Sequence, residues 1–180
     1  MVVVGGGKGV TCVAAARAAG EHGRVTAFEG GAAQVDMALR TIALNRLSHL
    51  IDVHHAIVGP AISVYDSSAD VKRIAASELP ACDVLELDCE GAEVDILQNM
   101  TITPRVILVE THGMYGSTSP LCTALLEAKG YRVTPLGLAE PRVADYCEQN
   151  DIRILAGERS PMQEPAKAAK DLSPERRPEA

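Results

Sequence analysis

The chain has 180 residues, of which 47% are hydrophobic, and its formal net charge is −7 at pH 7. This length and hydrophobic fraction are sufficient for one domain with a substantial core. The negative charge disfavours a nucleic acid or an anionic membrane as an obligatory partner, because both would repel the protein. No apolar stretch approaches the roughly 20 residues of a membrane span, and the start lacks the basic flank of a secretory signal, so the sequence predicts a cytoplasmic protein.

Cysteine usage agrees with that compartment. The five cysteines include no Cys-x-x-Cys pair, so neither a zinc knuckle nor a disulfide framework is indicated. We interpret them as reduced, mostly buried thiols: Cys12, Cys82, Cys89, Cys122 and Cys147.

The start of the chain has the pattern of a strand that leads into a nucleotide-binding loop. Val2–Val4 is typical of a central parallel strand, and the glycines Gly5, Gly7 and Gly9 precede a helical stretch. Glycine lets a ligand lie against bare backbone, and the next helix offers unpaired N–H groups. Val10 occupies the third glycine position of the dinucleotide fingerprint, which weakens an NAD interpretation, and a tight turn without a ligand is the alternative.

A second strand places an acidic residue near this loop. The alanine-rich stretch from Val10 to Ala19 predicts a helix closed by Gly20, and Val25 to Phe28 predicts a strand that ends on Glu29. Glu29 lies close to the interval of about 20 residues at which nucleotide folds place a carboxylate on ribose hydroxyls. The alternative is a solvated glutamate at a strand end.

The next helix begins after Gly30-Gly31. The spacing predicts one buried face, which would carry Val35, Leu39, Ile42, Ala43 and Arg46.

A third strand is expected over Ile51–Val58, followed by a break at Gly59-Pro60 and an extended stretch over 62–65. Adjacent residues on a strand point to opposite faces, so His54 and His55 are not expected to share a metal ion. The sequence predicts no metal site.

Two further strands end in polar residues. Asp83–Leu87 is followed by Asp88, Glu90 and Glu93, with a helix beginning near Ala92. Because ligands of parallel sheets bind beyond the carboxyl ends of the strands, these acids belong to the candidate site. Glu93 would alternatively favour the helix N-terminus.

The strand Arg105–Glu110 is apolar throughout its centre and ends in Glu110, Thr111 and His112. An imidazole titrates near neutral pH, so His112 is the preferred general base over Asp88 and Glu110. Strand alternation would place Glu110 and His112 on one side, where the carboxylate would orient the ring. A structural histidine at a strand end is the alternative.

The remaining elements complete one domain over 1–158. Pro120 to Lys129 predicts a helix capped by Gly130, and 131–134 and 151–155 predict the last two strands. The residues 159–180 are rich in Pro, Glu, Lys and Ala, so we expect a disordered polar tail.

Taken together, the sequence resembles class I S-adenosylmethionine-dependent methyltransferases, and specifically the FkbM family. The resemblance spans Val2 to about Gly157. It is carried by Val-Val-Val-Gly-Gly-Gly-Lys-Gly at the start, Val-Thr-Ala-Phe-Glu ending at Glu29, Asp-Val-Leu-Glu-Leu-Asp-Cys-Glu-Gly-Ala-Glu ending at Glu93, and Val-Ile-Leu-Val-Glu-Thr-His ending at His112.

The resemblance implies a Rossmann-like three-layer α/β/α sandwich, whose seven-stranded, mostly parallel sheet has one antiparallel edge strand. It implies S-adenosyl-L-methionine as the cofactor and transfer of a methyl group to a hydroxyl oxygen of a small molecule or glycan. In this reading the glycine loop borders the amino-acid end of the cofactor, Glu29 holds its ribose, and the residues at the end of the third strand line its adenine. The cofactor-binding residues implied are Gly5, Gly6, Gly7, Lys8, Gly9, Glu29, Gly30, His55, Ala56 and Asp88, the last of which would face the methionine part or the acceptor.

Two departures from the family leave alternatives open. Val3 stands where such enzymes often carry an acid two positions before the first glycine, and the chain begins directly at the first strand, whereas family members have upstream sequence that closes the pocket. One alternative is an NAD(P)-dependent Rossmann oxidoreductase, although none of the tyrosines has a lysine four residues later. The other is a non-catalytic S-adenosylmethionine-binding or interaction module. An oligomer would cover the exposed N-terminal side.

Overall fold

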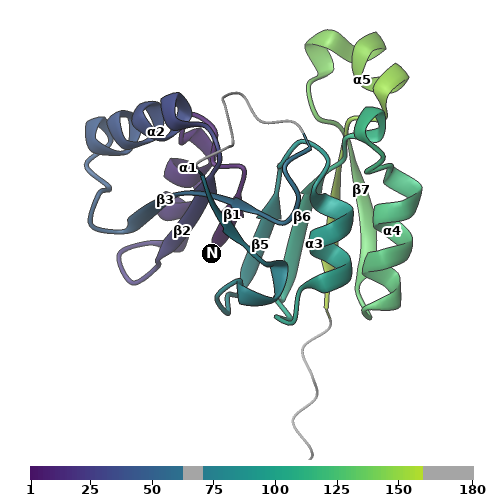
Figure 1. Ribbon diagram of the computed structural model, residues 1–180, viewed down its shortest axis with the longest axis horizontal. Helices are drawn as coiled ribbons and strands as arrows, with labels where there is room; N and C mark the ends of the chain where they lie inside the picture. The colour runs from purple at the N-terminus through teal and green to yellow at the C-terminus, as the bar shows by residue number, and fades with distance from the viewer. Residues whose placement is uncertain (63–70, 160–180) are drawn as a thin grey trace, which may run out of the picture.

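Eight strands form a single sheet in the computed structural model, which describes residues 1–62 and 71–159 (Figure 1). The strands are β1 (Val2–Val4), β2 (Val25–Glu29), β3 (Ile51–Val58), β4 (Lys72–Ile74), β5 (Val84–Leu87), β6 (Val106–Glu110), β7 (Arg132–Leu138) and β8 (Arg153–Glu158). The α-helices are α1 (Val10–Ala19), α2 (Ala32–Leu44), α3 (Glu93–Asn99), α4 (Ser119–Ala128) and α5 (Ala144–Asn150). Short 3-10 turns cover Ala76–Glu78, Gly113–Tyr115 and Pro141–Val143.

The strand order is β4-β3-β2-β1-β5-β6-β8-β7. The pairs from β4 to β6 are parallel, whereas β8 is antiparallel to both β6 and β7, so antiparallel pairing is confined to one edge of the sheet. This confirms the predicted Rossmann-like, mostly parallel sheet. It has eight strands where the sequence predicts seven, because the short strand β4 pairs with the end of β3.

The core lies on both sides of the central strands. On one side, Leu85, Leu87 and Ile107 of the sheet pack with Ile96 of α3 and Leu126 of α4, and all five are fully buried. On the other side, a second cluster joins β1–β3 to α1 and α2 and consists of Val3, Cys12, Val13, Ala16, Val25, Ala27, Ile42, Leu50 and Ile51. Burying a side chain of this size stabilises the fold by about 1.5 to 3 kcal/mol relative to leaving it exposed.

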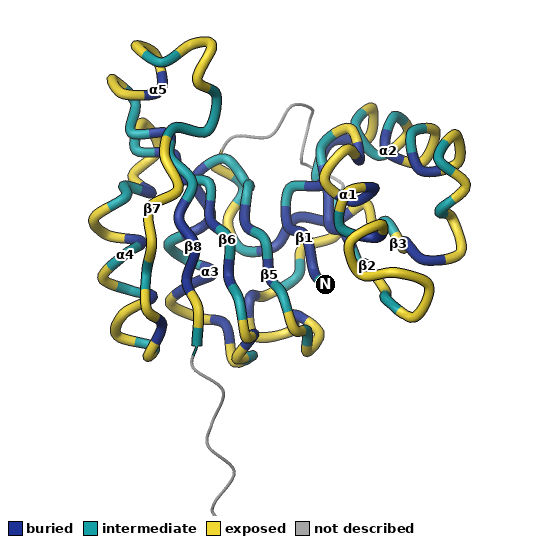
Figure 2. Tube along the Cα trace, turned by 180° about the vertical axis from the view of Figure 1, so that it is seen from behind, coloured by how far each residue is buried: buried dark blue, intermediate teal, exposed yellow. Residues whose placement is uncertain are grey.

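One face of the sheet is only partly covered. Seen from behind, β5, β6 and β8 have no described helix in front of them, whereas α1 and α2 lie over β1–β3 (Figure 2). Val84, Glu86, Val106 and Leu108 lie on this face and are partly exposed, while their neighbours along the same strands are buried. The apolar centre of the strand ending at Glu110 is therefore buried on one face of the sheet and partly exposed on the other.

The structure also differs from the sequence-based expectations at α2, β4 and α5. On α2 the buried residues are Ala38 and Ile42, and Leu39 is 48% exposed, because only a narrow strip of this helix meets the sheet. The sequence predicts neither β4 nor α5. Of the extended stretch expected over 62–65, residues 63–65 lie outside the described part of the chain, as does the expected tail from residue 160 onward.

The last described residue, Arg159, contacts the sheet. Its backbone N–H donates to the carbonyl of Arg105, and its guanidinium lies 5.4 Å from the centre of the Tyr131 ring. Among the described helices, none combines the length and the apolar character that a membrane span requires.

Candidate functional site

The carboxyl ends of the parallel strands bring distant residues together. Val4 of β1 is in register with Phe28 of β2 and with Leu87 of β5, so the loop after β1 meets Glu29 on one side and Asp88 on the other. A cavity with an empty volume of about 630 Å³, part of it open to solvent, lies at this edge. Its lining includes Val4, Gly5, Gly7, Phe28, Glu29, Gly30, Ala56, Ile57, Val58, Pro60, Ile62, Asp88, Cys89, Glu90 and Ala92.

The glycines of the loop differ in what a side chain would meet at each position. A Cβ on Gly5 would lie 1.6 Å from the carbonyl oxygen of Asp88, so this glycine allows close contact between the loop and the end of β5. A Cβ on Gly9 would lie 2.9 Å from Cα of Ala38, so Gly9 allows α2 to pack on the start of α1. Gly7 has a φ of +48° and no described atom within 4 Å of an added Cβ, so the loop leaves open space there.

Glu29 is buried and bonded to the loop. Its Oε2 accepts a hydrogen bond from the N–H of Gly7 at 2.7 Å, and its Oε1 accepts one from the N–H of Gly31 at 2.7 Å. Only 6% of the residue is exposed, which is inconsistent with a solvated glutamate at a strand end. Each carboxylate oxygen can accept a further hydrogen bond, so Glu29 can both hold the loop and bind a hydroxyl group.

The other residues implied for cofactor binding divide into two groups. Gly5, Gly7, Glu29, Gly30, Ala56 and Asp88 line the cavity. Outside the lining, the side chain of Lys8 is exposed to solvent, and Gly6 and Gly9 are buried. His55 is exposed, and its Nε2 lies 3.1 Å from the carbonyl oxygen of Gly30, while His54 stacks on Phe28. The structure thus places Ala56, but not His55, in the wall of the cavity.

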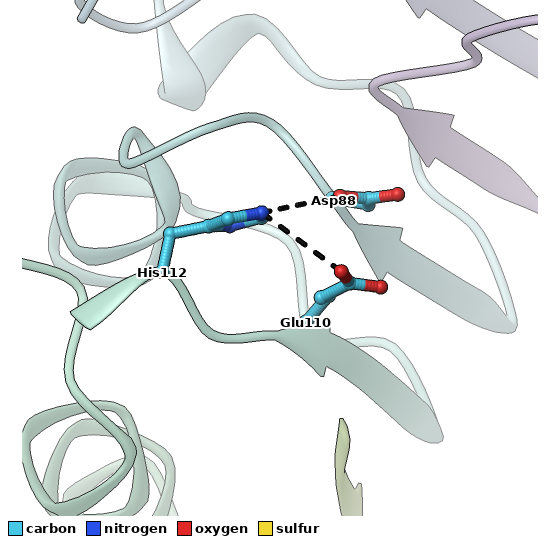
Figure 3. Close-up of side chains that lie close together, drawn as sticks. All are labelled: Asp88, Glu110 and His112. Atoms are coloured by element: carbon cyan, nitrogen blue, oxygen red, sulfur yellow. Dashed lines mark ion pairs between the residues drawn. The ribbon is translucent and has the colours of Figure 1, made fainter. Parts of the chain in front are cut away.

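The three candidate catalytic residues lie together at the ends of β5 and β6 (Figure 3). Nε2 of His112 is 3.7 Å from Oδ1 of Asp88 and 3.9 Å from Oε1 of Glu110. Glu90, in the loop after β5, brings its Oε2 to 3.6 Å from the same nitrogen. Among the described residues, the carboxylate oxygens around Nε2 are therefore all beyond ordinary hydrogen-bonding distance.

Glu93, rather than Glu110, orients the imidazole ring. Oε1 of Glu93 lies 2.9 Å from Nδ1 of His112 and accepts a further hydrogen bond from the N–H of Cys89 at 3.0 Å. Glu93 is 0% exposed and His112 is 4% exposed. The sequence gives no signal for this pair, because Glu93 is the first residue of α3 and His112 lies beyond the end of β6.

The environment shifts the pKa values of the cluster. Burial raises the pKa of Asp88 to about 7, and the charge of Glu110 adds to the effect. Burial likewise raises the pKa of Glu86 to about 7. For His112, burial acts to lower the pKa, but the hydrogen bond and charge of Glu93, with the charges of Glu90 and Asp88, outweigh it and raise the pKa to about 9. The ring is therefore protonated at neutral pH in this arrangement.

The same side chains have the composition of a cation site. One ligand atom from each of Asp88, Glu110 and His112 lies within 4.8 Å of the others. Carboxylate oxygens and imidazole nitrogens are ligands of divalent metals. The sequence predicts no metal site, whereas in the structure these ligands come from the ends of two adjacent strands, β5 and β6, which pair in parallel.

Structural comparison identifies proteins with the same fold. TomG, an O-methyltransferase of Streptomyces achromogenes crystallised with S-adenosylmethionine (SAM), has 16% identity and a TM-score of 0.55, over 88% of this chain and 72% of that chain. An O-methyltransferase of Bacillus cereus in complex with S-adenosylhomocysteine (SAH) has 14% identity and a TM-score of 0.55, over 88% and 73%. Magnesium protoporphyrin IX methyltransferase of Synechocystis PCC 6803 with bound SAM has 14% identity and a TM-score of 0.57, over 88% and 69%.

These similarities establish the fold. No protein-family model matches the sequence, and comparison with curated proteins finds no match.

Proposed function

We propose that the protein is a SAM-dependent methyltransferase that transfers a methyl group to a hydroxyl oxygen of a small molecule or glycan. The observation that carries the proposal is the cavity at the carboxyl edge, because it joins the glycine loop, Glu29 and Asp88 in one space. Proteins with this fold have been crystallised with SAM or SAH, which supports the choice of ligand.

The chemistry of the cavity fits the parts of SAM. Ala56, Ile57 and Val58 form an apolar wall that would suit the adenine ring. Glu29 has remaining acceptor capacity for the ribose hydroxyls, and the open space at Gly7 would admit a ligand close to the backbone. The acidic side chains of Asp88 and Glu90 would favour the positively charged methionine end.

In the proposed reaction SAM supplies a methyl group on a positively charged sulfur. The protein would contribute mainly by holding the acceptor oxygen in line with that group, since orientation alone supplies much of the barrier reduction. The acceptor proton must leave as the new bond forms. In the metal-free protein the raised pKa of Asp88, about 7, suits a proton acceptor at neutral pH, whereas the pKa of about 9 keeps His112 protonated. We therefore propose Asp88 as the base in place of His112.

The resemblance to the FkbM family and the formation of an oligomer are further parts of this proposal. Similarity to the FkbM family rests on the four sequence segments given above, of which those ending at Glu93 and His112 are the most specific. An oligomer remains a prediction, for which the partly covered face of β5 and β6 provides the motivation.

Isothermal titration calorimetry with SAM, SAH and NAD tests the proposal. We expect SAM and SAH to bind with one-site isotherms and NAD to give no heat. Binding of NAD without binding of SAM would replace the proposal with the oxidoreductase alternative. If SAM binds, SAH production is then measured with a panel of hydroxylated small molecules and glycans, and SAM binding without turnover on any of them would favour the non-catalytic module.

A further inference from the structure

We propose that Asp88, Glu110 and His112 bind a divalent metal cation. The three side chains converge from two adjacent strand ends (Figure 3). Nε2 of His112 lies 3.7 Å from Oδ1 of Asp88 and 3.9 Å from Oε1 of Glu110. Two ligands of one cation, each at about 2.1 Å from it, are separated by about 3.0 to 4.2 Å, depending on the bond angle. The observed separations fall in this range, although they are too long for direct hydrogen bonds.

The orientation of His112 gives a second, independent observation. The ring is nine-tenths buried and fixed by the hydrogen bond between Nδ1 and the buried carboxylate of Glu93. Because Glu93 accepts the proton of Nδ1, the other nitrogen of a neutral ring would carry a lone pair, and that nitrogen is directed at the carboxylates of Asp88 and Glu110. A carboxylate that holds the far nitrogen of a ligating histidine is the usual outer arrangement of a metal site.

The charges around Nε2 favour a cation over other ligands. Glu90 adds a third carboxylate at 3.6 Å from this nitrogen. Among the ion pairs of residues 1–62 and 71–159, no lysine or arginine pairs with Asp88 or Glu110. A set of two or three carboxylates with one imidazole suits Mn²⁺-like divalent ions, which prefer oxygen ligands and accept nitrogen.

The cluster is also accessible from the cavity. Asp88 lines the cavity, and its side chain is 40% exposed, while the side chains of Glu90 and Glu110 are 28% and 27% exposed. A bound cation would therefore retain positions for water or for an oxygen of a bound molecule. Its use in catalysis rests on the proposed function: an acceptor hydroxyl bound to the cation would lose its proton more readily, to water or to a cluster carboxylate.

Metal and proton compete for the same nitrogen of His112. In the metal-free protein the imidazolium of His112 partly neutralises the carboxylates of the cluster. In the metal-bound protein the cation neutralises them instead, and the ring is neutral. The role of Asp88 as the base therefore holds only for the metal-free protein.

Titration of the full chain with Mn²⁺, followed by calorimetry and by loss of the free-ion electron paramagnetic resonance signal, tests the site without SAM. We expect one bound ion per chain. Asp88→Asn, Glu110→Gln and His112→Ala should each weaken Mn²⁺ binding by at least tenfold, whereas Glu127→Gln, which removes one exposed acid on α4, should leave it unchanged. Circular dichroism identifies any variant that fails to fold, and the nearly isosteric variants Asp88→Asn and Glu110→Gln then decide the result.

Unchanged Mn²⁺ affinity in the folded Asp88→Asn and Glu110→Gln proteins would overturn the proposal. Binding of spermidine in place of Mn²⁺ would also overturn it and would assign the cluster to an ammonium group. Because SAM is absent from this experiment, its result is separate from that of the proposed function: loss of SAM binding with retained Mn²⁺ binding contradicts only the latter.

Discussion

Nδ1 of His112 lies 2.9 Å from Oε1 of Glu93, and both side chains are buried. The pair joins the first turn of α3 to the segment after β6, so it fixes the ring relative to the strand ends that carry Asp88 and Glu110. The pKa of the Glu93 carboxyl is lowered: its burial opposes the shift, and the hydrogen bond and charge of His112 outweigh it. The pair is therefore ionic at neutral pH.

Removal of one partner should strongly destabilise the protein. Glu93→Ala leaves a buried imidazolium without its acceptor, and breaking a buried pair in this way costs about 3 to 5 kcal/mol of the free energy of unfolding. Urea unfolding measures this loss. Glu127→Ala, at an exposed position of α4, serves as the control and should change the free energy by less than about 0.5 kcal/mol. Equal effects of the two substitutions would show that the contact does not stabilise the fold.

The glycine loop offers a second test of stability. Gly5→Ala places a Cβ 1.6 Å from the carbonyl oxygen of Asp88, so the end of β5 must shift, and we expect a loss of at least about 3 kcal/mol. Gly7→Ala meets no described atom within 4 Å, and its positive φ should cost only about 1 to 2 kcal/mol. Urea unfolding of both variants compares them directly. Similar losses would mean that the close contact at Gly5 relaxes without cost.

The first half of the fold is predictable because its signals are local. The strand at Val2–Val4, the helix at Val10–Ala19 and the strand ending at Glu29 have the predicted bounds, since apolar runs and glycines mark both ends of each. In contrast, β4 (Lys72–Ile74) is a short polar strand that exists only through its pairing with β3. The seven residues of α5 are too few to show a helical period.

The site is predictable in its location but not in its contacts. Strand ends identify Asp88, Glu110 and His112 as neighbours, because parallel strands share one edge. Strand alternation, however, assigns Glu110 to orient the ring. It fails because β6 ends at Glu110, and His112 has φ −129° and ψ 73°, outside the strand. The sequence-based choice of His112 as base stays a prediction, and the sequence does not reveal the buried Glu93 that raises the pKa of its ring.

Glu29 provides a test of ligand binding. Glu29→Ala should weaken SAM binding by about 1.5 to 3 kcal/mol for each charged hydrogen bond lost to the ribose, which corresponds to roughly 10-fold to 150-fold in Kd. Calorimetry measures this change, and Glu21→Ala, at an exposed turn, is the matched control. Glu29 also holds the N–H groups of Gly7 and Gly31, so a thermal melt must accompany the titration. A folded Glu29→Ala protein with unchanged affinity would contradict the ribose role.

The final prediction concerns the dependence of stability on pH in the metal-free protein. Glu86 and Asp88 have pKa values of about 7 in the folded state, above their ordinary values of 4.5 and 3.8, and the pKa of His112 is about 9, above 6.5. Each group binds protons more tightly in the folded than in the unfolded chain. Stability from His112 is full below pH 6.5 and is lost as pH rises to 9, and the two carboxyl groups destabilise the folded state as pH rises from about 4 to 7.

All three contributions have the same sign, so the free energy of unfolding should fall continuously from pH 5.5 to 8.5. Glu93 and Glu140 do not oppose this trend, because their pKa values are lowered and they titrate below pH 4.5. Urea unfolding at pH 5.5, 7.0 and 8.5 in the presence of a chelator measures the slope. Glu86→Gln should flatten it between pH 5.5 and 7.0 while leaving the decrease above pH 7 in place, because that part belongs to His112. A wild-type protein that becomes more stable over this range would show that the carboxylates around His112 do not hold its proton.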